Sequence, residues 1–165
     1  MSELLLRPER IRLKNDAGHT VFSTDLPMMA VLASYTGTLN LPSHAPELSY
    51  TATHQTDHLI GAVPPAADRV LAWGQLSDPS DYIPANRPFD LSGGVVLTGN
   101  AVKFSGYAQQ IYLWQCLQPL VSGGNLYLRE TWFNHRSSSP AYAGVTIPAI
   151  SIDYNLRAVA FVGGS

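Results

Sequence analysis

The chain has 165 residues, which is enough for one domain with its own core, and its apolar fraction of 45% excludes a disordered protein. Charged residues make up only 13%, against about 25% in typical soluble domains. The 10 basic residues are scattered, so the sequence predicts no nucleic-acid partner. Cys116 is the only cysteine, which excludes an intrachain disulfide and a cysteine-based metal cluster.

The low charge has a consequence for the surface. Its polar positions are filled mainly by Ser, Thr, Asn, Gln, Gly and Tyr, which form adaptable contact surfaces. A free monomer normally carries charges that keep it soluble and unassociated. We therefore expect the chain to work inside an assembly. The alternative is a secreted β-domain, because such domains are also rich in Ser, Thr and Asn.

At the start of the chain, residues 1–9 are expected to form an extension ahead of a single β-domain at 10–165. The apolar run Leu4–Leu6 is too short for a signal peptide and far too short to span a bilayer. The sequence therefore predicts neither general secretion nor a membrane partner.

Residues 10–41 predict a hairpin and a further strand. Ile11 and Leu13 alternate with basic residues, and residues 15–18 suit a tight turn before a return strand at Val21. Met28–Leu41 is rich in β-forming residues, with Gly37 as a bulge or bend. Residues 42–57 are rich in turn-forming residues and are expected to be an exposed excursion. Such a segment can lie across a neighbouring subunit, as can residues 1–9.

Further short strands are expected along the rest of the chain. Residues 58–63 and 69–76 flank the Pro64–Pro65 break, and the proline-rich stretch 78–93 is expected to be a long ordered loop. Residues 94–106 predict a hairpin closed by Gly99–Asn100. A second hairpin is expected around residues 122–124.

The last strand has the clearest alternation. Ile150, Ile152, Tyr154 and Leu156 alternate with polar residues, which predicts one buried and one exposed face. Residues 111–117, IYLWQCL, are apolar on both faces, as in an inner strand. Together these patterns predict an all-β fold, an antiparallel β-sandwich or jelly roll of about ten short strands.

Histidines form the most tempting cluster for chemistry. His44, His54 and His58 fall in one polar segment, and a helix would place the last two on one face beside Asp57, as a metal pair requires. The prolines nearby argue against a helix. In a strand His54 and His58 would lie about 13 Å apart, at about 3.3 Å per residue, which is too far for one metal. We expect ordinary histidines and no metal site.

No catalytic residue is predicted either. Asp78, Asp81 and Asp90 sit where aspartates commonly cap turns. Glu130 is expected to face outward near Arg129 as an ion-pair partner. No G-x-S-x-G elbow or phosphate-binding glycine loop occurs. We therefore expect no enzymatic activity and no cofactor.

Aromatic residues and sulfur-containing residues are interpreted as packing. The aromatic set matches a β core or a protein interface, and the alternative is a stacking platform for host-surface glycans. Met28–Met29 is expected to fill gaps, and Cys116 to be a buried, inert thiol. The aromatic set comprises Trp73, Trp114, Trp132, Tyr107, Tyr112, Tyr127 and Tyr142.

The opening hairpin resembles the start of small accessory tail proteins of tailed bacteriophages. Those chains begin with a strand, an Asx-x-x-Gly turn and a return strand of the type V-F-S-T-D. The resemblance covers about the first thirty residues and implies no catalytic residues, while the proline-rich middle departs from it. The matching positions are Ile11, Leu13, Asn15, Gly18, Val21, Phe22, Ser23, Thr24 and Asp25.

Together, composition and resemblance predict a non-enzymatic structural protein of a bacteriophage virion, most simply a tail component. Its expected partners are copies of itself and other virion proteins, bound through many weak contacts that symmetry repeats. We expect it to be made in the bacterial cytoplasm and to reside in the virion. The alternatives are a capsid decoration protein and a glycan-binding module for host recognition.

Overall fold

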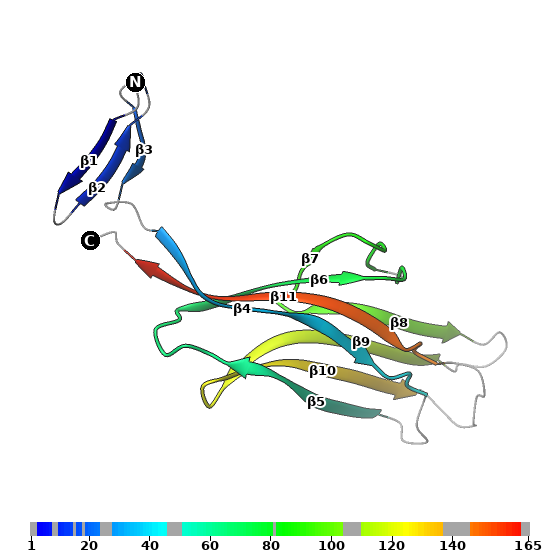
Figure 1. The fold of residues 1–165 in the computed structure, drawn as a ribbon. Coiled ribbons are helices and arrows are strands. Elements are labelled where there is room, and N and C mark those ends of the chain that lie inside the picture. Colours follow the sequence, from blue (N-terminus) through cyan, green and yellow to red (C-terminus); the bar gives the residue numbers. More distant parts are fainter. Residues whose placement is uncertain are drawn as a thin grey trace.

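The computed structural model describes residues 3–7, 10–14, 16–17, 19–23, 28–45, 51–80, 82–103, 110–136 and 146–162 (Figure 1). Within these ranges it has eleven strands, which form one three-stranded and two four-stranded antiparallel sheets. The all-β prediction is confirmed, although the two larger sheets contain eight strands where about ten were expected. In the described ranges no helix has the length and apolar character needed to cross a bilayer.

The small sheet has the order β1-β2-β3 and contains the predicted opening hairpin. Its pairing places Leu13 opposite Phe22, so the strand–turn–strand prediction is confirmed. Residues 3–7 pair antiparallel with β2 in the same sheet. The division of the chain at residue 9 stays a prediction. The strands are β1 (Glu3–Arg7), β2 (Arg10–Lys14) and β3 (Thr20–Ser23).

The two larger sheets each combine strands from distant parts of the sequence. The first has the order β4-β11-β6-β7, with β4 (Met28–Leu41), β11 (Ile150–Val162), β6 (Arg69–Leu76) and β7 (Phe89–Asp90). The second has the order β5-β10-β9-β8, with β5 (Thr51–Ala62), β10 (Asn125–Arg136), β9 (Gln110–Ser122) and β8 (Val95–Lys103).

An aliphatic core shared by these two sheets joins them into a sandwich-like body (Figure 1). Leu156 and Ile152 of β11 are fully buried, and so are Leu126 and Leu128 of β10 in the other sheet. Successive strand residues point to opposite faces, so the intervening residues face outward. The predicted alternation along β11 is confirmed, since its buried residues are separated by exposed ones such as Asp153.

Strand β5 shows that the prediction of an exposed excursion at residues 42–57 was wrong for its second half. Thr51–Ala62 is a twelve-residue strand that pairs with β10 over its whole length. Its polar sequence concealed the alternation, because its half-buried positions include the histidines His54 and His58 instead of aliphatic residues. Residues 46–50 lie outside the described part of the chain.

Two glycines also lie inside continuous strands rather than at the predicted bulge or bend and the predicted hairpin turn. The chain continues through Gly99 and Asn100 as β8, so the predicted hairpin there was wrong. A Cβ atom on Gly99 would lie 2.7 Å from the indole ring of Trp114. A Cβ atom on Gly37 would lie 2.6 Å from the Tyr154 hydroxyl oxygen, and the register shift in β4 falls instead next to Ala33. Both glycines leave room for an aromatic ring that crosses the backbone.

The hairpin between β9 and β10 is as predicted. Its turn residues Gly123 and Gly124 have φ angles of 56° and 76°. Two successive positive φ values fit the twist of antiparallel strands and favour glycine at both positions. The turn thus fixes β9 beside β10, and β9 is an inner strand as its apolar sequence predicted.

Truncating a core leucine should cost far more stability than truncating an exposed one. We expect Leu156→Ala to lower the free energy of unfolding by about 2–5 kcal/mol, because a fully buried side chain leaves a cavity. Leu59→Ala is the matched control, since that side chain is 63% exposed, and should stay within about 0.5 kcal/mol. Urea unfolding followed by tryptophan fluorescence measures both; equal losses would show that the sheets do not share this core.

Candidate functional site

The acidic residue Glu130 lies inside the body and not on its surface. It is 2% exposed, so the prediction that it faces outward beside Arg129 was wrong. Alternation along β10 points Arg129 outward, where it binds Asp57 through two hydrogen bonds, Nε to Oδ1 at 2.6 Å and Nη2 to Oδ2 at 2.8 Å. The same alternation directs Glu130 inward with Leu128.

The buried carboxylate has polar partners from three other segments. The Gln115 amide donates a hydrogen bond of 2.8 Å to Oε1, and the His44 Nε2 atom lies 2.7 Å from the same oxygen. The His58 Nε2 atom lies 3.4 Å from Oε2. A buried carboxylate is tolerated only when such partners replace water, so these contacts account for an acidic residue in the interior.

An indole ring joins the remaining histidine to this group. Trp132 stacks on His44 with ring centroids 4.6 Å apart and on His54 with centroids 4.2 Å apart. His54 lies directly opposite Trp132 in the pairing of β5 with β10. The sequence placed these histidines in an exposed segment, whereas the structure gathers them around two residues of β10. We call the six residues His44, His54, His58, Gln115, Glu130 and Trp132 the histidine–glutamate cluster.

The geometry of the histidine–glutamate cluster favours a structural role. The Nε2 atoms of His44 and His58 are directed at the two oxygens of Glu130 and not at a common point. Among the described residues, no group of three or more His, Cys, Asp or Glu side chains is placed to hold a metal ion. The backbone of His44 also exchanges two hydrogen bonds with Ile147. The cluster therefore fastens residues 42–45 and 146–149 to the inner face of β10.

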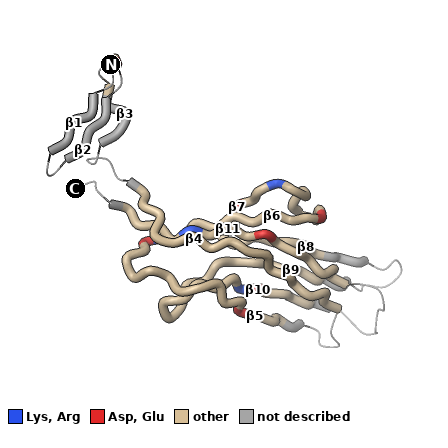
Figure 2. The backbone as a smooth tube through the Cα atoms, in the orientation of Figure 1, with Lys and Arg blue, Asp and Glu red and all other residues tan. Residues whose placement is uncertain are grey.

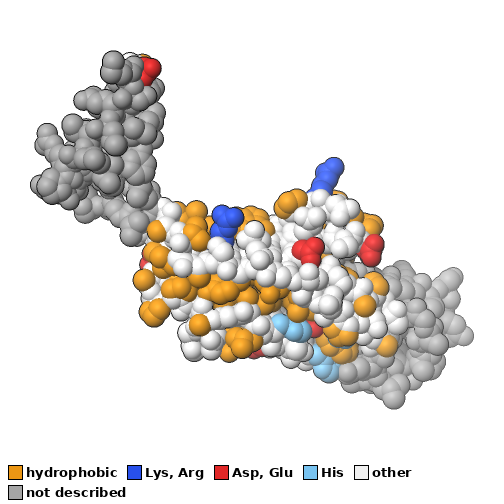
Figure 3. Space-filling model, viewed as in Figure 1, with side chains coloured by type: hydrophobic (Ala, Val, Ile, Leu, Met, Phe, Trp, Pro, Cys, Tyr) orange, Lys and Arg blue, Asp and Glu red, His pale blue; other side chains and the backbone are white. Residues whose placement is uncertain are grey.

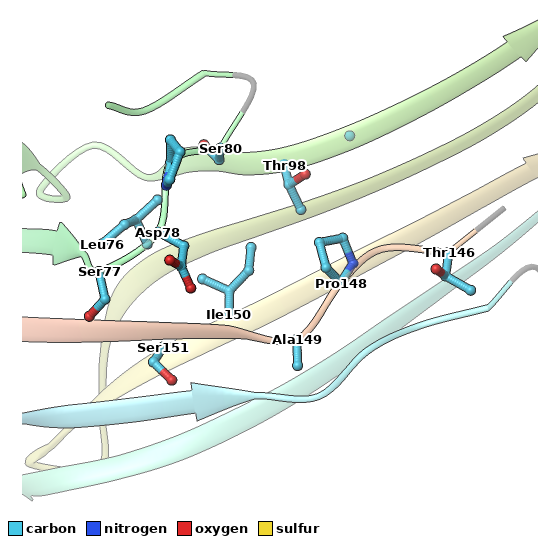
Figure 4. A pocket seen from close by; sticks show the side chains of 12 residues that line it. Leu76, Ser77, Asp78, Ser80, Thr98, Thr146, Pro148, Ala149, Ile150 and Ser151 are labelled. Atoms are coloured by element: carbon cyan, nitrogen blue, oxygen red, sulfur yellow. The ribbon is translucent and has the colours of Figure 1, made fainter. Parts of the chain in front are cut away.

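A cavity of about 590 Å³ lies beyond the end of β6 (Figure 4). Ser77, Thr98 and Ser151 are among its lining residues, and Asp78 is the carboxylate-bearing residue among them. Asp90 lies elsewhere, and a hydrogen bond from the Ser92 backbone holds the pKa of its carboxyl below the usual value. Asp81 lies outside the described residues. The cavity brings together no pair of carboxyl groups for acid–base chemistry.

The aromatic residues divide into packed and exposed ones. Trp114 packs across Gly99 and against Tyr82 at a centroid distance of 6.0 Å, whereas Trp73 on β6 is 37% exposed. Tyr127 is half-buried. Burial raises the pKa of the Cys116 thiol, in keeping with an unreactive cysteine. The side chain of Tyr112 is not described, and Tyr107 and Tyr142 lie outside the described residues.

The most conspicuous surface feature is a lack of charge. Figure 2 shows how sparsely acidic and basic residues are spread over the described strands, and Figure 3 shows hydrophobic and uncharged polar side chains over most of the described surface on one face. At the Met28 end of the first sheet, four large apolar residues are 39–50% exposed, and Met29 is one of them, so the prediction that it fills a gap in the packing was wrong. We call these the apolar end of β4: Met29, Val31, Leu32 and Phe161.

Removing the buried carboxylate should destabilise the fold. We expect Glu130→Ala to lower the free energy of unfolding by about 1–3 kcal/mol, because the Gln115 amide and the His44 ring lose their acceptor. Glu130→Gln keeps an acceptor of the same shape and should cost less. Urea unfolding at neutral pH measures both, and equal losses would contradict the role given to these hydrogen bonds.

The surface pair Asp57–Arg129 should contribute to acid sensitivity. The Arg129 guanidinium holds the pKa of Asp57 below its ordinary value, so the unfolded chain takes up a proton there more readily. The stabilisation is present above about pH 4 and is lost as the pH falls through the lowered pKa. Asp57→Asn should therefore give a shallower loss of unfolding free energy between about pH 5 and pH 2.

Arg129→Gln is the control for this titration, because it removes the partner and leaves the carboxylate. It should flatten the same pH profile, and salt should weaken the effect in the wild type because both side chains are partly exposed. A profile like that of the wild type in both variants would show that this pair does not set the acid limb.

Comparison with known proteins gives no relative to argue from. No protein-family model, no curated protein and no solved structure matches the chain. Function is therefore inferred from the geometry and chemistry of the chain's own residues.

Proposed function

We propose that this chain is a non-enzymatic structural subunit of a bacteriophage particle, a tail component, that assembles by adding strands along β4. The observation that carries the proposal is the open edge of the first sheet. β4 stands at the end of the order β4-β11-β6-β7, and its fourteen residues contain no Lys, Arg, Asp, Glu or Pro. An edge strand of this kind presents unpaired backbone donors and acceptors to another chain.

The edge of β4 lacks most of the devices that usually prevent such pairing. Proteins blunt edges with charge, proline, very short strands, bulges or a covering segment, and of these β4 has a register shift next to Ala33. The opposite edge, β7, has only two residues, and the edge strand β5 carries the Asp57–Arg129 ion pair. Among the described residues, no backbone hydrogen bond other than those to β11 reaches β4. A long, uncharged edge exposes a monomer to unwanted pairing with other chains, whereas it gives an assembling subunit a binding surface.

The apolar end of β4 lies on the same strand and its partner. Phe161 of β11 pairs with Met29, and Val159 pairs with Val31. Apolar side chains beside an open edge add hydrophobic contact area to the backbone pairing. The low net charge of −2 adds little repulsion between copies. Strand addition and apolar contact thus act at one place.

The assignment to a phage tail rests on the opening hairpin, whose form resembles that of small accessory tail proteins. A capsid decoration protein is the alternative, since it would use the same kind of edge contact. The jelly-roll arrangement stays a prediction. A jelly roll pairs strands that are distant in sequence, and the pairs β4–β11 and β5–β10 are of this kind. The pairs β6–β7 and β8–β9 instead join strands that are neighbours in sequence.

Charge placed on the open edge should prevent assembly. We expect the wild-type protein to form larger species as its concentration rises, and Val31→Lys to remain monomeric because a lysine on an edge strand opposes pairing. Val121→Lys is the matched control: Val31 is 46% and Val121 50% exposed, but Val121 lies on the inner strand β9. Light scattering and electron microscopy of the purified proteins measure the outcome.

Two results would overturn the proposal. One is a wild-type protein that stays monomeric at every concentration and binds no virion protein. The other is assembly that Val31→Lys and Val121→Lys impair equally, which would place the contact away from β4.

A further inference from the structure

The outer face of the first sheet contains a groove that the assembly proposal does not use. It has a volume of about 380 Å³ and is lined from β4, β11 and β6 and from the segment before β7. Trp73 and Pro88 are its large apolar side chains. We infer that this groove binds a neutral carbohydrate, with one pyranose ring seated against Trp73.

The strand registers bring the polar side chains of the groove into two rows. Thr36 and Trp73 both lie opposite Asn155, on either side of it. In the next row, Gln75 lies opposite Asp153. Because these positions share the outward face, amide, hydroxyl and carboxylate groups surround one exposed indole ring. A pyranose ring has the matching combination of an apolar C–H face and a rim of hydroxyl groups.

One of these polar groups lacks a hydrogen-bond partner. The Oδ1 atom of Asn155 is inaccessible to solvent and accepts no hydrogen bond in the structure. A buried acceptor without a donor is unusual in a folded protein and needs an explanation. It lies in the row of Thr36 and Trp73, beside the indole. Because solvent does not reach this atom, a ligand hydroxyl can donate to it only if the side chains around it move apart on binding.

The charge and polarity of the groove select the class of ligand. Asp153 repels phosphates and other anions, and Arg157, whose guanidinium lies over the Trp73 ring, is not among the lining residues of the groove. A proline-rich peptide also docks on aromatic residues, but it presents mainly carbonyl acceptors. Asp153 is an acceptor only, and its Oδ1 already accepts a hydrogen bond of 2.6 Å from Thr38, which holds it in place. Acceptors in the groove call for donors on the ligand, and sugar hydroxyls provide them.

Arg157, on the neighbouring strand β11, lies over the face of the indole ring. Its guanidinium carbon lies 5.9 Å from the centre of the Trp73 ring. The same arrangement occurs elsewhere on β11 and β6, where Arg69 lies 6.0 Å from the ring of Phe161. Phe161 is 50% exposed and does not line the groove. The chain thus contains a natural control for Trp73: an exposed aromatic residue with a similar cation partner outside the groove.

Binding should be tested with defined neutral sugars. We would titrate the wild-type protein with maltopentaose, cellopentaose, mannopentaose and chitotriose, using isothermal titration calorimetry and saturation-transfer NMR. At least one sugar should bind saturably, and Trp73→Ala should lower the affinity for that sugar at least tenfold. Asn155→Ala should lower the affinity for the same sugar several-fold, and Trp73→Phe should retain most of the affinity because it keeps an aromatic face.

The controls separate the groove from the fold and from assembly. Phe161→Ala and Val31→Lys should bind the sugar as the wild type does, and urea unfolding should show that Trp73→Phe is folded. The inference is overturned if none of the four sugars binds, if Phe161→Ala weakens binding as much as Trp73→Ala, or if decaproline binds the groove in their place. Loss of assembly in Val31→Lys with sugar binding intact would keep the two proposals distinct.

Discussion

The shared aliphatic core fixes the register of β11 between β4 and β6, and the surface of that sheet depends on this register. Leu156 can be buried only if its neighbours Asn155 and Arg157 face outward. A slip by one residue would exchange the two faces and place amide and guanidinium groups in the core. The burial of leucines therefore also places Asn155 between Thr36 and Trp73. The burial of the core leucines and the composition of the groove therefore both follow from the register of β11.

The inner face of the other sheet departs from this simple division. A carboxylate among aliphatic side chains is costly unless its partners are held in place, and Glu130 is held by residues of β9, β5 and the segment after β4. Because the contacts come from different parts of the chain, they form only when the strands are in their final order. The histidine–glutamate cluster thus favours one arrangement of the strands at this end of the body, whereas leucines alone would bury apolar surface without selecting an arrangement.

Local patterns could predict the elements whose determinants lie close in sequence. The alternation after Ile150, the glycine turn at residues 123–124 and the strand at Met28–Leu41 were all predicted from neighbouring residues. The second half of β5 matches the strand expected at residues 58–63, but its first half was missed because the partners of its polar face are distant in sequence: His54 lies opposite Trp132 of β10. Gly99 was misread because the ring that requires it belongs to the next strand. Such residues acquire their meaning only from the sheet order.

The sheet order also decides which strand is an edge, and this relates assembly to the groove. Thr36 belongs to the edge strand and lines the groove, so the groove reaches β4, whereas Trp73 lies two strands further in on β6. A strand added there would extend the sheet beyond Thr36 and continue its outer face, while the apolar contacts with Val31 and Phe161 would form at the other end of the strand. β4 contains no charged residue that would repel a second copy. A copy that adds its strand at the edge of β4 leaves Trp73 uncovered, because Trp73 lies on β6, two strands away. An assembly built this way would repeat the groove once per subunit, and repetition of a weak site is what gives a multivalent particle its avidity.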